Sequence, residues 1–142
     1  MKLEILSFNW KLFKSREVIS VTAMTKTWEI TVLDNHISLI TSLKPSVVNI
    51  LYFDENNTKK EENFAIWWGI LEISKNSMKI LVDMLVWLEE VDIDLAEKAR
   101  QEALALMEKY KNSKDRVDME SFIEAQDMLM KSVAQLKLWS LR

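Results

Sequence analysis

The residues able to do chemistry in this chain are few, and its single histidine is the most obvious of them. His36 lies in the segment Asp34-Asn35-His36, and an imidazole can act as a general base near neutral pH. Such a base needs a nucleophile or an orienting carboxylate in a recognisable pattern around it, and the sequence supplies none. We therefore interpret His36 as a turn or surface residue.

Three carboxylates, Asp92, Asp94 and Glu97, come close together before a helical stretch and could suggest a metal site. Acidic residues at a helix start more commonly cap the helix or complement its dipole. The chain has no cysteine, which removes disulfides, thiolate chemistry and cysteine-based zinc sites. Its one glycine leaves no glycine-rich phosphate loop. We expect no catalytic residue, no metal site and no cofactor, and so a protein that is not an enzyme.

Length and charge narrow the class of protein. The chain has 142 residues, 49% of them hydrophobic, which suits one globular domain or one domain with an appendage. The net charge is −3 without a basic stripe, so the electrostatic footprint of a nucleic-acid binder is missing. The N-terminus does not resemble a secretory signal. No apolar run approaches the roughly 20 residues needed to span a bilayer, so we expect membrane contact only through a partner.

The elements that must position these residues fall into two halves. Over residues 1–88 the pattern is one of short runs that alternate apolar and polar residues, for example 18–24, 28–32 and 48–52. A polar run, residues 54–62, interrupts them and predicts a solvated hairpin loop. Many short strands with closely spaced turn signals are typical of an antiparallel β-sandwich.

After Glu90 the apolar spacing becomes helical. Asp94 followed by Glu97 suggests a capping box at the first helix, residues 112–115 suggest a turn, and a second helix is expected to begin near Asp118. The apolar stripes of the two helices comprise Leu95, Ala99, Ala103, Leu106 and Tyr110, and then Phe122, Leu129, Val133 and Leu136. The sequence thus predicts an α+β protein in which an antiparallel two-helix hairpin over residues 91–142 follows the sandwich.

One long segment resembles a known family. Residues 28–50, WEITVLDNHISLITSLKPSVVNI, are similar to the segment GVLPNHAPLITSLKPGVV of the F-type ATP synthase epsilon subunit. The opening KLEILS with the following KLF, the stretch FAIWWGILEISKNSMKILVD and the helix start VDIDLAEKARQEA also resemble that family. The resemblance covers nearly the whole chain.

The resemblance implies a non-catalytic rotor subunit of the central stalk of a proton-transporting ATP synthase. It implies that residues 1–88 bind the gamma subunit and the c-ring, and that Glu29, Asn35 and His36 contact the c-ring. The hairpin, residues 91–142, would move between a folded and an extended position, reach the alpha and beta subunits when extended, and inhibit ATP hydrolysis. The protein would be peripheral to the cytoplasmic face of the plasma membrane.

The family also includes members that bind ATP on the hairpin through a motif like I/L-D-x-x-R-A. In this chain Asp92 and Ala96 match that motif, but Leu95 stands where arginine is expected, and Gln135 lies near a position that often carries arginine. An aliphatic side chain cannot donate hydrogen bonds to phosphate oxygens. We therefore expect the ATP-sensing motif to be degenerate.

Glycine and tryptophan occur in unusual numbers. An average composition of about 7% predicts roughly 10 glycines, but the chain has one glycine and six tryptophans. Trp10, Trp28 and Trp68 fall where the family commonly has glycine. One interpretation is a divergent sequence with extra apolar bulk. The hypothesis that we favour is that UGA codons specify glycine in the host and conventional translation renders them as tryptophan; six UGG codons would end it.

Two other classes of function stay open at this point. A free-standing adaptor would share the sandwich and the hairpin but not the match over residues 28–50, and would not co-purify with gamma. A small hydrolase would need a nucleophile and base in a pocket, with activity against esters or nucleotides.

Overall fold

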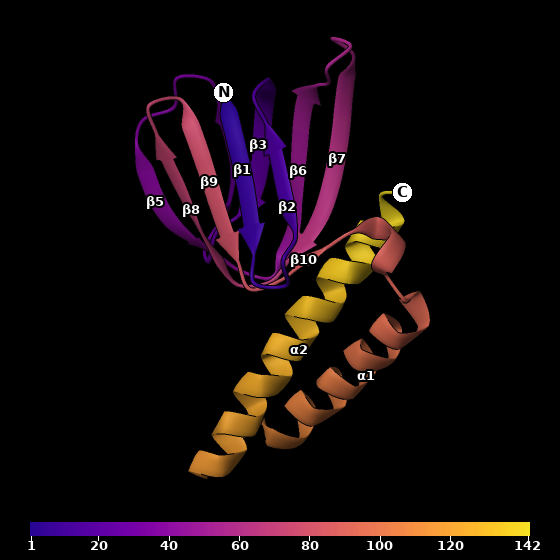
Figure 1. Cartoon of the computed structure of the whole chain (residues 1–142). Helices are drawn as coiled ribbons and strands as arrows, with labels where there is room; N and C mark the ends of the chain where they lie inside the picture. Colours follow the sequence, from indigo (N-terminus) through magenta and orange to yellow (C-terminus); the bar gives the residue numbers. More distant parts are fainter.

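The computed structural model describes all 142 residues and places a helical hairpin at one end of two stacked β-sheets (Figure 1). The predicted α+β architecture is confirmed. The ten strands are β1 Lys2–Ser7, β2 Leu12–Ser15, β3 Val18–Met24, β4 Glu29–Leu33, β5 Leu39–Leu43, β6 Ser46–Phe53, β7 Lys59–Ile66, β8 Gly69–Ser74, β9 Ser77–Val82 and β10 Leu85–Val86.

Each sheet has five strands. The first sheet has the order β2-β1-β9-β8-β5, and the second sheet has the order β10-β7-β6-β3-β4. All pairs are antiparallel except β1 and β9, which run parallel with Lys2 opposite Ser77. This parallel pair departs from the purely antiparallel expectation, because the first strand is inserted beside a strand from the end of the sandwich.

The core lies between the two sheets, where the inward side chains of alternating positions meet. Val21 faces Val32 on one neighbouring strand and Ile50 on the other, and all three are fully buried. The eighteen buried residues of this core are Met1, Leu3, Ile5, Val18, Val21, Ala23, Val32, Leu43, Val48, Ile50, Phe64, Ile66, Leu71, Ile73, Met78, Ile80, Val82 and Leu85.

Two turns show why particular residues are needed. Lys75 and Asn76 both have positive φ, at 49° and 60°, as a two-residue hairpin between twisted strands requires. At Gly69 a Cβ atom would overlap the Leu81 carbonyl oxygen and the Val82 side chain. The only glycine of the chain therefore occupies a site where another residue would displace the neighbouring strand.

The polar run at residues 54–62 differs from its prediction as a loop. The loop itself covers 54–58, where the Asp54 carboxylate accepts the N–H groups of Asn56 and Thr58, both at 2.9 Å. Strand β7 already begins at Lys59 and pairs with β6. Its first residues extend beyond the core, so that charged side chains can point into solvent on both faces.

The hairpin consists of α1, Ile93–Tyr110, and α2, Arg116–Ser140, and a short 3₁₀ helix, η1, Leu88–Glu90, precedes it. The cap of α1 is Asp92, whose carboxylate accepts the Leu95 N–H at 3.1 Å. The sequence predicted a capping box that begins at Asp94. The helix instead begins two residues earlier, because Asp92 provides the N-cap oxygen. Asp115 caps α2 in the same way, accepting the Val117 N–H at 2.9 Å.

The side chains buried between and beneath the helices are small. They are Ala96 and Ala103 on α1, and Ala125, Ser132, Ala134 and Leu138 on α2. Leu95, Leu106 and Val133, which the apolar stripes included, are instead exposed. Most of these buried residues are alanines, because close approach of backbones requires small side chains, and Ala134 packs with Val47 and Ala65 of the second sheet.

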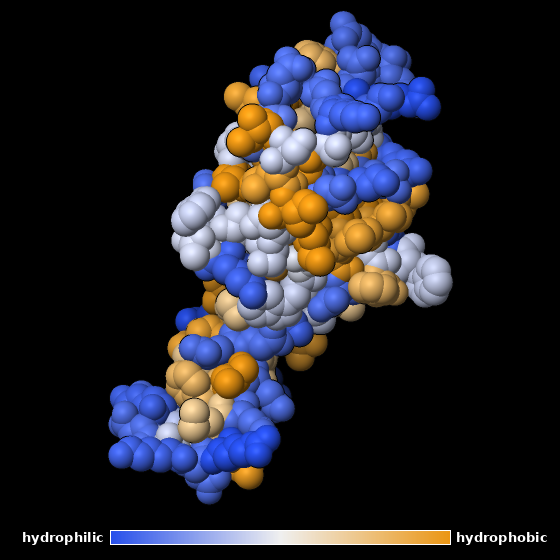
Figure 2. Space-filling model, turned by 90° about the vertical axis from the view of Figure 1, so that its left-hand side faces the viewer, coloured by the Kyte–Doolittle hydropathy of each residue, from blue (hydrophilic) through white to orange (hydrophobic).

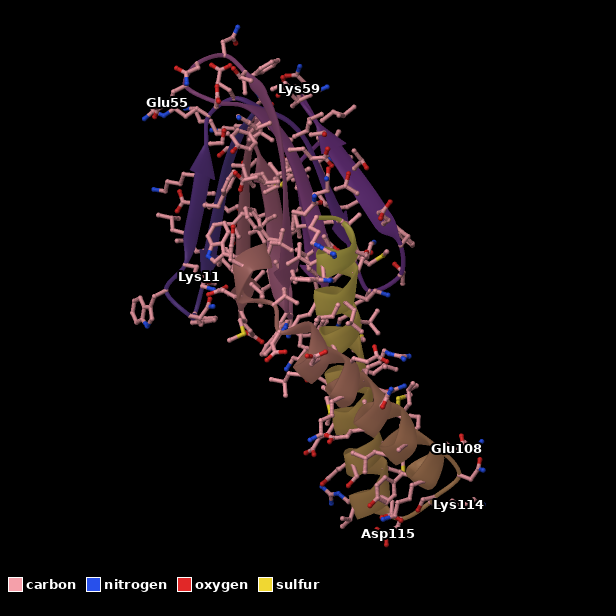
Figure 3. The ribbon with its side chains drawn as sticks, turned by 90° about the vertical axis from the view of Figure 1, so that its right-hand side faces the viewer. Lys11, Glu55, Lys59, Glu108, Lys114 and Asp115 are labelled. Carbon is pink, nitrogen blue, oxygen red and sulfur yellow. The ribbon has the colours of Figure 1, made fainter.

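The sandwich has two unlike ends. The hairpin end carries the loops at residues 8–11, 25–28, 44–45 and 67–68, and there the C-terminal half of α2 contacts β6 and β7. The free end carries the loops at 34–38, 54–58 and 75–76. Figure 3 labels Glu55 and Lys59 at the free end, and Glu108, Lys114 and Asp115 at the distant tip of the hairpin.

Candidate interaction surfaces

His36 lies at the free end, in the loop between β4 and β5. Its Nδ1 is 2.8 Å from the carbonyl oxygen of Ile37. The preceding Asn35 has a φ of 62° and donates its backbone N–H to Oδ1 of Asn76, at 3.1 Å. This bond fastens the loop to the β8–β9 turn. The imidazole thus contacts a main-chain carbonyl, and the loop presents an ordered surface with Ile37 exposed.

Glu29 is not close to this loop. It begins β4, whereas Asn35 and His36 follow the end of the same strand, and five residues of strand span about 15 Å. Glu29 pairs with Met24 at the hairpin end, where it lines a hollow with Pro45 and Met130. The structure therefore brings Asn35 and His36 together and places Glu29 at the opposite end of the sandwich.

Two of the three carboxylates around the start of α1, Asp92 and Glu97, have structural partners, and Asp94 lies in the first turn of the helix. Asp92 caps the helix, and Glu97 accepts hydrogen bonds from Arg100, one turn later, at 2.5 and 3.2 Å. The hydrogen bond from Arg100 lowers the pKa of the Glu97 carboxyl. Ala96 is buried, while Leu95 is exposed to solvent. Nowhere does the structure gather three or more His, Asp or Glu side chains suited to a metal ion.

An apolar row crosses the outer face of the first sheet. Leu6 lies opposite Leu12 on one side and Leu81 on the other, and Leu81 lies opposite Ile70. These four side chains on four adjacent strands are between 37% and 51% exposed. Figure 2 shows apolar side chains gathered on this side of the sandwich. We call Leu6, Leu12, Leu81 and Ile70 the apolar row.

Sequence reasoning missed the apolar row, although a signal was present. Leu6 directly follows the inward Ile5, and Leu81 lies between the inward residues Ile80 and Val82. A strand with solvent on one face would carry a polar residue at such outward positions. Consecutive apolar residues in these strands therefore indicate a second covered face.

Next to the apolar row, toward the free end, charges of alternating sign cross the same strands. Lys14 lies opposite Glu4, Glu4 opposite Lys79, and Lys79 opposite Glu72. Lys14 Nζ and Glu4 Oε2 are 3.5 Å apart. Opposite charges on directly facing residues stabilise the sheet modestly, and they border the apolar row with a polar rim.

The outer face of the second sheet carries a row of uncharged polar side chains instead. Thr31 and Thr22 face each other with their hydroxyl oxygens 2.9 Å apart. Farther along the row, the Asn49 amide donates to Oδ1 of Asn63 at 2.9 Å. These polar groups satisfy one another, so this part of the outer face of the second sheet has no apolar row like that of the first sheet.

At the hairpin end, α2 rests on the second sheet through a small apolar cluster. The cluster comprises Val47, Ala65, Val86, Val91, Ala134 and Leu138. Beside it, the Trp68 indole N–H donates to Asp127, and Lys131 Nζ lies 4.3 Å from the centre of the Trp67 ring. Asp127 and Lys131 form an ion pair at 2.7 Å. Six mostly small residues and a few polar contacts thus hold the hairpin in place.

The tryptophans at glycine-like positions differ in conformation. Trp10 has a φ of 63° and is 96% exposed, so a bulky side chain occupies the left-handed region without packing in return. Trp28 and Trp68 are not in that region. The backbone therefore favours glycine at Trp10 and is neutral at the other two positions.

One hollow on the surface measures about 790 Å³ and lies near the free end, between β1, β2 and the β6–β7 hairpin. Four basic and four acidic side chains line it, among them Lys2, Arg16, Glu17 and Asp54. Their charges balance, so the hollow favours neither an anion nor a cation. Neither helix contains an apolar stretch able to span a bilayer.

A comparison with known proteins identifies a family that this chain matches. Residues 1–88 match the model of the β-sandwich domain of the ATP synthase delta/epsilon chain. The ATP synthase epsilon chain of Clostridium kluyveri is 34% identical over 138 residues, which cover 97% of this chain and 96% of the relative. The epsilon chain of Hydrogenovibrio crunogenus is 31% identical over 137 residues, or 96% of this chain and 87% of the relative.

Two solved structures have a similar fold. A chain of the Euglena gracilis mitochondrial ATP synthase, in a structure of OSCP, F1 and c-ring, superposes with a TM-score of 0.75 at 23% identity. The match covers 99% of this chain and 80% of that one. A chain of the central stalk and c-ring of the Tetrahymena thermophila enzyme gives 0.66 at 14% identity, covering 98% and 96%.

Proposed function

The chain belongs to the ATP synthase epsilon chain family, and we propose that it acts as the non-catalytic subunit of the central stalk that joins gamma to the c-ring. As an epsilon chain it is part of a membrane-associated complex. The observation that carries the proposal is that three parts of the sandwich have unlike surfaces. These parts are the outer face of the first sheet, the free end and the hairpin end. Each suits a different neighbour in a rotor.

The apolar row is the surface for gamma in this proposal. Four aliphatic side chains lie half-exposed in a continuous line with a charged rim, which is the anatomy of an interface rather than of a free surface. Stable interfaces bury about 800 Å² on each partner. The row therefore forms the centre of the contact, and the neighbouring loop at residues 8–11, with Phe8 80% exposed, extends it.

The free end is the surface for the c-ring. Asn35 and His36 form a polar, ordered loop there, and the hairpin leaves the sandwich at the opposite end. A subunit that rests on the c-ring at one end can then direct its hairpin toward the alpha and beta subunits. Glu29, at the hairpin end, lies outside this contact. The complex sits at the cytoplasmic face of the plasma membrane in this proposal.

The apolar row is tested with the whole chain. Leu81→Asp places a charge in the middle of the row and should abolish co-purification with gamma. Thr31→Asp introduces the same charge on the outer face of the second sheet and is the matched control. Equal loss of gamma binding in both variants would refute the assignment of the face. Full binding of gamma by the Leu81→Asp variant would also refute this assignment.

The c-ring contact is tested by comparing the two ends of β4. His36→Ala should leave the fold intact and weaken the coupling between proton flow and ATP synthesis in membrane vesicles. Glu29→Ala should have less effect, because that residue lies at the hairpin end. The opposite order of effects would place the c-ring at the hairpin end. Loss of a chemical activity in the isolated His36→Ala chain would instead indicate an enzyme.

The hairpin is the regulatory element in this proposal. An ATP synthase in which this chain is truncated to residues 1–90 should still assemble. It should hydrolyse ATP faster, because the segment that reaches the catalytic subunits is missing. Unchanged hydrolysis would exclude inhibition by the hairpin. Because Leu95 replaces the arginine of the ATP-sensing motif and points into solvent, calorimetric titration of the isolated chain with ATP should detect no micromolar binding.

A further inference from the structure

The hairpin is connected to the sandwich by one short segment. Residues 83–92 include β10, with only two residues, and η1, with three. In β10, Leu85 lies opposite Ile66 and Val86 opposite Ala65 on β7. A strand of this length at the edge of a sheet would separate easily if these pairs were its only support.

The loop between β1 and β2 supplies further support from the other side. The Asn9 side-chain amide donates to the Leu85 carbonyl oxygen at 3.0 Å, and the Leu85 N–H donates to Asn9 Oδ1 at 3.2 Å. One side chain thus forms the two-way pairing that a peptide group forms in a sheet. The residues that it joins lie 76 positions apart in the sequence.

A second residue of the same loop holds η1. Lys11 Nζ is paired with Oε2 of Glu90, and the same oxygen accepts the Trp87 N–H at 2.9 Å. The Lys11 side chain is 21% exposed and the Glu90 side chain is 44% exposed, so the lysine is partly buried while the carboxylate lies at the surface. Figure 3 labels Lys11 at the end of the sandwich from which the hairpin extends. We call Asn9 and Lys11, with their partners Leu85 and Glu90, the clasp.

The contacts that hold the linking segment on the sandwich end after Val91. Val91 is 8% exposed and packs in the apolar cluster with Leu138, whereas Asp92 is exposed and already caps α1. The two residues have extended backbone, with φ and ψ of −73° and 117° at Val91 and −93° and 101° at Asp92. They lie between a clasped segment and a capped helix.

We propose that the clasp anchors residues 85–90 to the sandwich and so confines the hinge of the hairpin to Val91 and Asp92. The hairpin then turns as one unit about these two residues once α2 leaves the second sheet, while β10 and η1 stay in place. This inference rests on the proposed regulatory role for its biological meaning. Its physical content concerns the isolated chain alone.

Hydrogen exchange of the whole chain tests the hinge position. In the unaltered protein, the amides of Leu85 and Trp87 should exchange much more slowly than those of α1. Asn9→Ala removes both bonds to Leu85 and should raise the exchange rate of Leu85 about tenfold or more. Lys11→Ala should raise the rate at Trp87. The amides of β8 should keep their rates in both variants.

Lys14→Ala is the matched control, because this lysine lies on β2 near Lys11 but pairs with Glu4. It should leave the amides of residues 85–90 unchanged. Exchange of these amides in the unaltered chain at the rate of α1 would overturn the proposal, since the segment would then move with the hairpin. An Asn9→Ala variant with an unchanged Leu85 rate would also overturn it.

Distances between spin labels provide an independent measurement, and the absence of cysteine allows labels at Lys79→Cys and Lys109→Cys. The double change Asn9→Ala with Lys11→Ala should broaden the distance distribution between sandwich and hairpin. An unchanged distribution would refute the anchor. Neither measurement involves gamma or the c-ring, so failure of the proposed function would leave these results unaffected, and failure here would leave the stalk assignment intact.

Discussion

The sandwich and the hairpin are stabilised by side chains of very different size. The eighteen residues of the sandwich core are mainly isoleucine, leucine, valine, methionine and phenylalanine. The helices of the hairpin bury four alanines, one serine and one leucine. Burial contributes about 25 cal/mol per Å² of apolar surface, so a helix face of alanines gains far less than a strand of branched residues. The hairpin is therefore the part that can move.

For the function that we propose, the contrast explains how one chain could combine a fixed part of a rotor with a hairpin that changes position. The relative orientation of the two outer faces of the sandwich is fixed, because any change in it would require the core between the sheets to open. The hairpin can leave the second sheet at the cost of a six-residue cluster and a few polar contacts. A cost of a few kcal/mol permits two populated positions.

The largest expected effect comes from breaking the core of the sandwich. Phe64 is 2% exposed and packs edge-on against Trp87, with ring centres 4.6 Å apart. Phe64→Ala should lower the free energy of unfolding by about 3–5 kcal/mol, as measured by urea denaturation. Phe8→Ala, at an exposed position, should change it by less than about 0.5 kcal/mol. A loss below about 1 kcal/mol for Phe64→Ala would contradict the assigned core.

A smaller effect, confined to one part, is expected at the contact between hairpin and sandwich. Leu138 is 1% exposed at the C-terminal end of α2. Leu138→Ala should weaken docking by about 2–3 kcal/mol and speed hydrogen exchange throughout α2, while β8 and β9 keep their protection. Equal acceleration in both regions would show that the two parts unfold as one unit.

Trp10 allows a change in the opposite direction. Trp10→Gly relieves a left-handed conformation that costs a residue with a Cβ roughly 1–2 kcal/mol, and should raise the melting temperature. Trp28→Gly, where φ is not positive, should give no such gain. If UGA codons are read as glycine in the host, peptide masses of the natural protein will show glycine at position 10. Tryptophan in that peptide would refute the hypothesis.

The smallest effect at neutral pH concerns Tyr52, near the free end of the sandwich. Burial, together with a hydrogen bond to Glu62 at 2.7 Å, raises the pKa of Tyr52 from 10.0 to about 12. Because the folded-state pKa is raised, the stabilisation is complete below pH 10 and is lost as the pH rises toward 12. Tyr52→Phe should remove this alkaline loss while costing about 1 kcal/mol at neutral pH.

The sequence predicted the elements better than the surfaces. Alternation in 18–24 and 48–52 identified two core strands because inward positions must be apolar, and the turn at 112–115 separated the helices correctly. The helix faces were less predictable, since Leu95 is exposed and Ala96 is buried. In a hairpin of closely packed helices small size can outweigh hydrophobicity, so Leu95 marks the wrong face of α1, whereas Leu138 of α2 is buried.

The candidate surfaces depended on topology, which local patterns do not contain. Glu29 and His36 are seven positions apart and read as neighbours, yet a strand separates them. Leu6 and Leu81 are far apart in the sequence and meet only through strand pairing. The clasp joins Asn9 to Leu85, and neither residue carries a signal of this contact.

The parallel pairing of β1 with β9 also determines when the first sheet can form during translation. Because Lys2 lies opposite Ser77, the first sheet cannot close until β9 has been made. Residues 83–142 then take about 3–12 s at about 5–20 residues per second, whereas small domains fold within microseconds to seconds. The first sheet therefore has time to present its apolar row while the hairpin is still being translated. A partner that arrives during this interval would meet a nascent chain whose moving part does not yet exist.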